Sequence, residues 1–207
     1  MIHIVDDEEP LRDALAFQLD SHGLATRPFD SAESFLAYLT DRATPKNEPG
    51  CVLLDIRMPG IAGDALFAKM RDEALCPAWP VIFLTGHGDV SMAVEALKGG
   101  AFDFVEKPFN DNSMIDRLTA ALAESARRLE TERSAQSVEQ RLATLTPRER
   151  EVMDLMLEGN YNKVIADRLG IVMRTVEVYR AKVFEKMGVK SAVELAALLA
   201  SRDARKR

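Results

Sequence analysis

Residues 51–60 read CVLLDIRMPG, an apolar run that ends at Asp55 and is followed by the turn signal of Pro59 and Gly60. A continuous apolar run of this length predicts a strand that is buried on both faces. Asp55 then stands at the end of a core strand, where an unpaired carboxylate is costly. A lone aspartate at such a place most often caps a helix or lies in a turn, so its meaning depends on the rest of the chain.

Similar apolar runs recur through the first 122 residues and alternate with amphipathic stretches. The predicted strands are 2–5, 24–29, 51–54, 81–84 and 101–105, and the predicted helices are 9–22, 31–41, 62–75, 89–98 and 111–122. Strands that alternate with helices indicate βαβ units and a parallel sheet covered on both faces. We therefore predict an α/β domain at 1–122, with a flavodoxin-like, doubly wound, five-stranded parallel sheet.

The rest of the chain has a helical pattern. Residues 123–143 lack Gly and Pro and have a broken apolar stripe, which predicts that the fifth helix continues into a charged, mobile helical linker. At Thr146-Pro147-Arg148-Glu149 a capping Thr, an early Pro and a Glu three residues after the cap mark a helix start. Further helices are expected to end near Gly159, Gly170 and Gly188, with a last one over 191–200. These features predict a small all-α domain at 144–207.

Charge divides the chain as the secondary structure does. Residues 1–122 carry 10 Lys and Arg against 20 Asp and Glu, whereas residues 146–207 carry 13 against 9. The acidic and basic parts are expected to have different partners, with an anionic polymer as the candidate partner of the basic part. No run of 18 apolar residues indicates a membrane span. Strand-like residues directly after Met1 and two cysteines in apolar surroundings lead us to expect no signal peptide, buried free thiols and a cytoplasmic protein.

Polar residues stand at the carboxyl ends of four predicted strands. They are Asp6, Asp7 and Glu8 after the first strand, Asp55 after the third, Thr85 after the fourth and Lys107 after the fifth. In a doubly wound sheet the carboxyl ends of the strands border one ligand crevice. Each residue alone has an ordinary structural explanation, but their joint occurrence at the correct strand ends predicts a shared site.

The chemistry of that set is specific. Facing carboxylates repel one another, so Asp6, Asp7 and Asp55 predict a divalent cation that prefers oxygen ligands, and we expect Mg²⁺. A carboxylate is also a competent nucleophile towards phosphorus and forms an aspartyl phosphate. Lys107 and Thr85 are suitable donors to the phosphoryl oxygens. We therefore predict that Asp55 is exposed at its strand end because it accepts a phosphoryl group.

Four motifs make residues 1–122 similar to the receiver domain of two-component response regulators: IVDDE, LLDIRMPG, LTGHGDV and FVEKPF. The resemblance implies that a sensor histidine kinase phosphorylates Asp55, and that the backbone carbonyl of Arg57 completes the Mg²⁺ ligands. It also implies that Thr85 and Lys107 contact the phosphoryl group and that Phe104 is the switch aromatic residue. Mg²⁺-dependent phosphohydrolases are the alternative, but they need an acid two residues after the nucleophile, where this chain has Arg57.

The segment 162–191, NKVIADRLGIVMRTVEVYRAKVFEKMGVKS, predicts two helices around a glycine-containing turn. Its apolar residues form an inward stripe on each helix, which leaves a polar face on the second helix. This spacing is typical of a helix-turn-helix, in which the second helix enters the major groove of DNA. A bundle that binds a protein partner is the alternative, and a weak salt dependence of binding would favour it.

Residues 144–203 resemble the LuxR-type DNA-binding domain through LTPREREVM, NKVIADRLG, RTVEVYRAKVFEKM and KSAVELA. With the receiver, this places the resemblance in the FixJ/NarL class of response regulators, which are transcription regulators and not enzymes. The resemblance implies phosphate contacts by Lys163, Arg174, Thr175, Arg180 and Lys182, and base contacts by Glu177, Val178 and Ala181. The chain departs from the family at Tyr161 and Val172, where Ser usually stands.

The resemblance also suggests how the two parts communicate. We hypothesise that Thr85 moves towards the phosphoryl group on Asp55 and lets Phe104 rotate inward. The face formed by residues 89–98 and 101–105 would then pair with a second copy, since the helix carries Val90, Met92, Ala93 and Ala96. The expected partners are a cognate sensor histidine kinase, duplex promoter DNA, a second copy of the chain and RNA polymerase, with no membrane.

Overall fold

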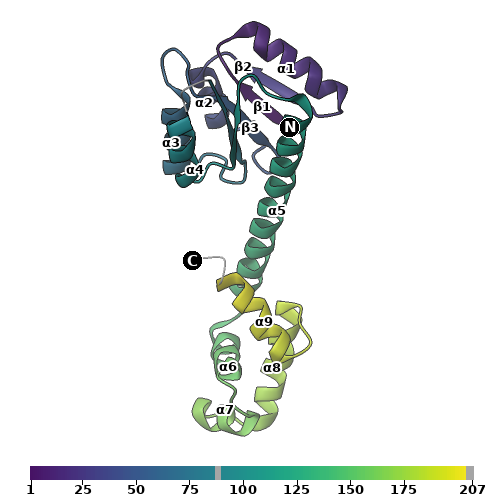
Figure 1. Cartoon of the computed structure of the whole chain (residues 1–207). Coiled ribbons are helices and arrows are strands. Elements are labelled where there is room, and N and C mark those ends of the chain that lie inside the picture. Colours follow the sequence, from purple (N-terminus) through teal and green to yellow (C-terminus); the bar gives the residue numbers. More distant parts are fainter. Residues whose placement is uncertain (87–89, 204–207) are drawn as a thin grey trace. The chain divides into compact units, whose positions relative to one another are not determined.

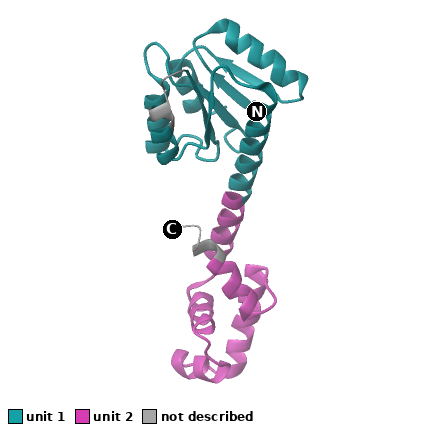
Figure 2. Cartoon of the chain, viewed as in Figure 1, with its two compact units in different colours: residues 1–130 teal, residues 131–207 magenta. Residues whose placement is uncertain are grey.

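The structure is a computed structural model, and it describes residues 1–86 and 90–203. The chain forms two compact units, Met1–Glu130 and Thr131–Arg207 (Figure 2). The boundary falls within one continuous helix, α5 (Asp111–Ala143). Each unit has a hydrophobic core of its own and is described separately.

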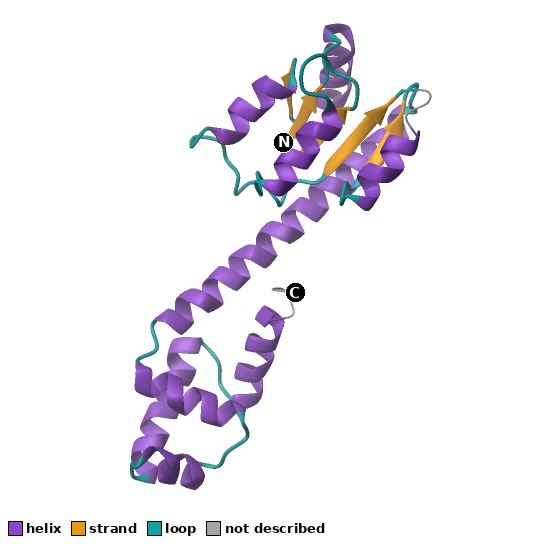
Figure 3. Cartoon of the chain, turned by 90° about the vertical axis from the view of Figure 1, so that its left-hand side faces the viewer, coloured by secondary structure: helices purple, strands orange, loops and turns teal. Residues whose placement is uncertain are grey.

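The first unit contains a five-stranded sheet in the order β2-β1-β3-β4-β5, drawn in orange in Figure 3. Its strands are β1 (Ile2–Val5), β2 (Thr26–Phe29), β3 (Cys51–Asp55), β4 (Val81–Thr85) and β5 (Asp103–Glu106). All four neighbouring pairs are parallel. The central strands β1 and β3 are buried along their whole length, because helices cover both faces of the sheet.

Alternate strand residues point to opposite faces and divide the apolar side chains into two clusters. One cluster joins the sheet to α2 (Ala32–Thr40), α3 (Gly63–Asp72) and α4 (Val90–Lys98). The other joins the opposite face to α1 (Glu9–Ser21) and to α5. Figure 1 accordingly has α3 and α4 to the left of the strands and α1 to the right. The flavodoxin-like α/β fold expected for this part of the chain is confirmed.

The ends of several elements differ from the prediction for identifiable reasons. Strand β2 begins at Thr26 and not at residue 24, because its ladder starts where Ile2 of β1 faces Thr26. Strand β5 begins at Asp103 and not at residue 101, since the Ala101 amide instead donates to the Ala96 carbonyl at the end of α4. The expected first residue of the fourth helix, 89, lies outside the described residues.

Helices are the only regular secondary structure among the described residues of the second unit. After α5 it contains α6 (Pro147–Leu157), α7 (Asn162–Leu169), α8 (Met173–Met187) and α9 (Ala192–Asp203). The expected capping box forms at α6: the Thr146 side chain accepts from the Glu149 amide, and the Glu149 carboxylate accepts from the Thr146 amide. Glu149 is also paired with Lys186 at 2.6 Å, and this partner accounts for its burial.

The segment 123–143 contributes to both units. In the first unit, the Ser125 hydroxyl accepts a hydrogen bond from the Gly50 amide, and Arg128 donates to the Pro77 carbonyl. In the second unit, Val138 and Leu142 are buried in the helical core. The second compact unit accordingly starts at Thr131 and includes the later part of the segment predicted as a linker. The apolar stripe of α5 is broken because its first part is buried in the core of the first unit and its last part in the core of the second.

Two further expectations concern burial and membranes. Cys51 and Cys76 are both buried and unpaired, as predicted. Within the described part of the chain, no helix combines the length and apolar character needed to span a membrane.

Candidate functional site

The predicted acidic residues meet at the carboxyl edge of the sheet. Asp6 follows β1 and Asp55 ends β3, and because these strands are neighbours their carboxylates come together with that of Asp7. One oxygen from each of the three lies within 4.8 Å of the others. Asp55 is 6 % exposed, so the expectation that it is exposed at its strand end is wrong: the ends of β1 and β3 bury it together with Asp6. Asp7 is exposed, so the cluster is open to solvent on that side. Three carboxylates at this spacing match the ligands that Mg²⁺ takes in proteins.

Lys107 brings a cation into the same cluster. Its Nζ lies 3.0 Å from Asp6 Oδ2 and 3.3 Å from Asp55 Oδ1, and a more distant contact of 3.9 Å reaches the exposed Glu8. The ladder between β4 and β5 determines this position, since the Lys107 amide donates to the Thr85 carbonyl at 2.7 Å. Burial lowers the pKa of Lys107, but its contacts with Asp6 and Asp55 outweigh burial, and the net shift is upward.

The Asp55 carboxyl has opposing influences on its pKa. Burial raises it most, the Lys107 charge lowers it, and the neighbouring Asp6 raises it again, with a net upward shift. A cation bound among the carboxylates would favour the charged form of Asp55. The protonation of Asp55 therefore depends on Lys107 and on a metal ion bound beside it.

Thr85 ends β4, directly after the residue that faces Asp55 of β3, and Phe104 lies within β5 opposite Phe83. Thr85 is 1 % exposed, and its hydroxyl oxygen has no hydrogen-bond partner among the described residues. A buried hydroxyl without a partner costs free energy, so a ligand that accepts from it is favoured. Phe104 is half-buried and packs against the hydrophobic core that joins the sheet to α2, α3 and α4. Arg57 lies on the loop after Asp55, with an exposed side chain.

Sequence reasoning missed two residues that position the carboxylates. Arg12, from α1, donates to the Asp6 carbonyl at 2.7 Å. Gly63 begins α3, and a Cβ atom there would lie 2.0 Å from the Asp55 carbonyl oxygen, so only glycine permits this approach. A glycine inside the predicted helix 62–75 was the available signal, since glycine is unfavourable within helices.

In the second unit, α7 and α8 form the predicted helix-turn-helix. Gly170 ends α7 in the left-handed conformation at φ 64° and allows the sharp turn into α8. Ile165 of α7 and Val176 of α8 are fully buried in the core of the second unit. Val183 and Met187 of α8 are fully buried in the same core. The inward stripe expected from the sequence is therefore correct, and it determines which side of α8 faces outward.

The candidate DNA contacts lie mainly on that outward side. Exposed among them are Lys163, Arg174, Glu177, Val178, Ala181 and Lys182, whereas Thr175 and Arg180 are half-buried. The Arg180 guanidinium lies 5.6 Å from the centre of the Phe184 ring, which holds it partly against the helix. Arg174 Nη1 lies 3.7 Å from Glu177 Oε2. The face thus combines cations with the exposed apolar side chain of Val178.

The two departures from the family pattern are N-cap residues in the structure. Tyr161 caps α7 and Val172 caps α8, and neither side chain makes a capping hydrogen bond. Their exposed fractions are 83 % and 68 %. Each missing cap is expected to cost about 1 kcal/mol of helix stability.

Comparisons with known families assign both units. Residues 2–119 match the response regulator receiver domain, and residues 143–199 match the bacterial regulatory proteins of the luxR family. The matched families and the similar curated proteins are transcriptional regulators, which argues against the phosphohydrolase alternative.

Individual relatives match over almost the whole chain. The chain is 50 % identical to the C4-dicarboxylate transport transcriptional regulatory protein DctR of Rhodobacter capsulatus, covering 94 % of this chain and 96 % of DctR. It is 44 % identical to the transcriptional regulatory protein FixJ of Bradyrhizobium diazoefficiens, covering 95 % and 93 %.

Solved structures agree with these matches. The response regulator StyR has a TM-score of 0.85 at 35 % identity, covering 96 % of this chain and 97 % of StyR. Full-length FixJ from B. japonicum has a TM-score of 0.58 at 40 % identity, covering 98 % and 97 %. The chain therefore belongs to the two-component response regulators that join a receiver domain to a LuxR-type DNA-binding domain.

Proposed function

We propose that Asp55 is the phosphoacceptor of this response regulator and that a cognate sensor histidine kinase is the donor. The observation that carries the proposal is the meeting of Asp6, Asp7 and Asp55 within 4.8 Å, with Lys107 bridging two of them. In our proposal the three carboxylates and the backbone carbonyl of Arg57 hold Mg²⁺. Bound Mg²⁺ would neutralise the carboxylates and the phosphoryl oxygens.

The transfer itself requires positioning and charge neutralisation from the protein. An Asp55 oxygen attacks phosphorus, the phosphorus–nitrogen bond of the kinase phosphohistidine breaks, and its electron pair returns to the imidazole. Lys107 loses its contact with Asp55 and donates to a phosphoryl oxygen, while it keeps Asp6 as a partner. The Thr85 hydroxyl, which has no partner among the residues that the structure describes, donates to another phosphoryl oxygen and so gains a hydrogen bond.

We further propose that phosphorylation promotes dimerisation through α4 and β5. A phosphoryl group adds roughly −1.5 to −2 charge beside Thr85, and movement of Thr85 would free space for Phe104. On α4 the described side chains Met92, Val94 and Leu97 are exposed apolar groups, available for a second copy. Of the residues expected at this face, the side chains of Val90 and Ala93 lie outside the described residues, and Ala96 is half-buried.

The proposed output is promoter binding by α7 and α8. Lys163, Arg174, Thr175, Arg180 and Lys182 are the proposed phosphate contacts, and Glu177, Val178 and Ala181 are the proposed base contacts. Phosphate contacts position the domain and base contacts carry specificity. A dimer would bind a two-fold operator in the cytoplasm and act on RNA polymerase there. Relatives are named for dicarboxylate transport, nodulation and the tetrathionate response, so we propose the shared activity and no particular target.

Mass spectrometry after incubation with acetyl phosphate and Mg²⁺ tests the phosphoacceptor. We expect one phosphoryl adduct, mapped to Asp55 and absent from Asp55→Asn. Asp64→Asn is the control, because Asp64 is an exposed carboxylate in the first turn of α3. Uptake of phosphate by Asp55→Asn at the rate of the unaltered chain would refute the proposal.

A further inference from the structure

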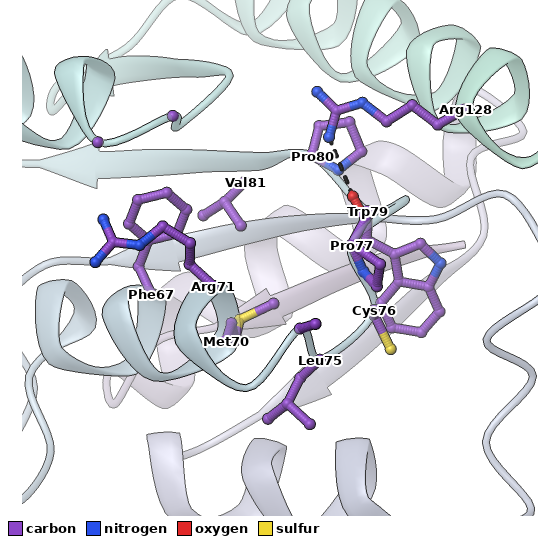
Figure 4. A pocket seen from close by; sticks show the side chains of 13 residues that line it. Phe67, Met70, Arg71, Leu75, Cys76, Pro77, Trp79, Pro80, Val81 and Arg128 are labelled. Atoms are coloured by element: carbon purple, nitrogen blue, oxygen red, sulfur yellow. Dashed lines mark hydrogen bonds between the residues drawn. The ribbon is translucent and has the colours of Figure 1, made fainter. Parts of the chain in front are cut away.

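A cavity of about 220 Å³ opens in the first unit between α3, the start of β4, the end of α4 and α5 (Figure 4). Pro80 and Val81 line it where β4 begins, whereas Thr85 stands at the opposite, carboxyl end of that strand. The cavity is therefore separate from the acidic cluster, and the proposed phosphoryl transfer makes no use of it.

The lining of the cavity is mostly apolar. Beside Pro80 and Val81 it includes the side chains of Phe67, Met70, Leu75, Cys76, Pro77 and Trp79. Burial raises the pKa of the Cys76 thiol, and the Lys46 charge opposes this, so Cys76 is a neutral apolar wall at physiological pH. Mostly apolar concave sites with a few polar groups are the usual form of small-molecule sites.

The chain makes an unusual turn along one wall. Ala74 and Cys76 both adopt φ 50°, in the left-handed region that residues other than glycine rarely enter. The turn is held by hydrogen bonds from the Leu75 amide to the Met70 carbonyl at 2.7 Å and from the Trp79 amide to the Cys76 carbonyl at 2.9 Å. Strained backbone of this kind persists where the surrounding structure determines it, and it is concentrated at binding sites.

Two guanidinium groups supply the polar part of the lining. Arg71 comes from α3 and is about half exposed, and Arg128 comes from α5 and donates to the Pro77 carbonyl at 3.3 Å. In Figure 4 they stand on different sides of the apolar side chains.

The charge of the residues that line the cavity favours an anion. None of the 13 lining residues is acidic, although the domain carries twice as many acidic as basic residues. Arg71 pairs with Asp72, and Arg128 shares Glu124 with Arg127. Both partner carboxylates belong to residues outside the lining, so the cavity wall itself carries two guanidinium groups and no carboxylate. Each arginine also retains further N–H donors beyond these pairs.

We propose that this cavity binds a small organic anion, a carboxylate with an apolar body. The apolar part packs against Trp79 and Leu75, and the carboxylate accepts hydrogen bonds from one of the two arginines and is attracted by the charge of the other. Such a ligand joins α3 to α5 through their arginines. The proposal does not rest on the phosphoacceptor or DNA-binding assignments.

Trp79 is a direct reporter of occupancy, because it is the only tryptophan in the chain and lines the cavity. The probe is phenylacetate, titrated into the full chain while tryptophan emission is recorded, and the matched neutral probe is phenylacetamide. We expect a saturable change with phenylacetate, binding at least about fivefold weaker for phenylacetamide, and weakening by added salt. No saturable change with phenylacetate up to about 10 mM overturns the proposal, and so does equal affinity for the two probes.

Variants locate the binding. Arg71→Gln and Arg128→Gln are each expected to weaken phenylacetate binding about fivefold or more. Lys69→Gln is the control, because Lys69 is a half-exposed cation on the same helix that does not line the cavity. If Arg128→Gln does not fold, the phenylacetate affinities of Arg71→Gln and of Arg128→Lys, which keeps the charge, test the proposal. An unchanged affinity in Arg71→Gln, or an equal loss in Lys69→Gln, overturns the assignment.

Discussion

Lys107 Nζ lies 3.3 Å from Asp55 Oδ1, although Lys107 directly follows β5 and β5 is not a neighbour of β3 in the sheet. Strand β4 separates β3 from β5, and the long lysine side chain crosses in front of its carboxyl end. The same ammonium lies 3.0 Å from Asp6 Oδ2 on the far side of β3. A single cation thus joins the ends of the three strands that carry the proposed phosphorylation site.

Lys107→Gln is expected to slow phosphorylation of Asp55 by acetyl phosphate about 100-fold, because a donor to the developing phosphoryl charge is lost. The measurement is the rate of adduct formation by mass spectrometry. Lys98→Gln serves as the control, since Lys98 is an exposed cation in the last turn of α4. A rate within twofold of the unaltered chain would remove Lys107 from the transfer step.

Chelation of divalent cations with EDTA is expected to abolish phosphorylation of Asp55, and Asp7→Asn is expected to weaken Mg²⁺ binding at least about tenfold. Asp7 is the exposed member of the cluster, so the variant should keep the fold. Isothermal titration with Mg²⁺ measures the affinity, with the exposed Asp13→Asn as the control. Equal Mg²⁺ affinity of Asp7→Asn and the unaltered chain would contradict the proposed ligand set.

Thr85→Ala is expected to accept phosphate yet to dimerise poorly. The variant removes the hydroxyl that we propose as the link between the phosphoryl group and the α4–β5 face. Because that hydroxyl has no partner among the described residues, its removal should cost little stability. Sedimentation with and without acetyl phosphate measures the mass. Full dimerisation of phosphorylated Thr85→Ala would show that Thr85 has no part in the switch.

Lys182→Ala and Val178→Ala should differ in their effect on DNA binding. Loss of a phosphate contact is expected to weaken binding to all duplexes about equally and to reduce the salt slope by about 1. Loss of a base contact is expected to relax specificity at one position, by about 1–3 kcal/mol. Competition between a selected duplex and a random duplex, at several salt concentrations, separates the two. The same profile for both variants would contradict the division into phosphate and base contacts.

His3 should make the stability of the first unit depend on pH. It is fully buried, with its ring centre 4.2 Å from that of Trp79, and burial lowers its pKa to about 4 although the bond with the Cys51 carbonyl opposes this. As the pH falls, His3 therefore takes up a proton near pH 6.5 in the unfolded chain but only near pH 4 in the folded chain. Stability contributed by neutral His3 is lost as the pH falls between these values, by about 3 kcal/mol at most.

Urea unfolding of the unaltered chain and of His3→Phe, between pH 4 and pH 7, measures this contribution. The difference in unfolding free energy between the two proteins should shift in favour of His3→Phe as the pH falls. His22→Gln is the control, because His22 is an exposed histidine at the end of α1. A difference that stays constant with pH would mean that His3 is not the titrating group.

The sequence by itself determined the class of each unit and the residues of the acidic cluster. Apolar runs such as CVLLD are local signals, and the rule that parallel strands end at one edge turns them into a prediction about distant residues. That rule alone predicts that Asp6, Asp55 and Lys107 lie at one site. The inward stripe of α8 was equally readable, because helical periodicity is a property of the local chain.

The tertiary structure decided what depends on contacts between distant segments. Strand β2 starts at Thr26 because β1 supplies its first partner there, and no local pattern contains that information. The roles of Arg12 and Gly63 beside Asp6 and Asp55 depend on how α1 and α3 pack against the ends of β1 and β3. The division of α5 at Glu130, and the presence of both Arg71 and Arg128 in the lining of one cavity, likewise follow from packing. Pairing and burial involve residues far apart in the chain, so periodicity and composition do not specify them.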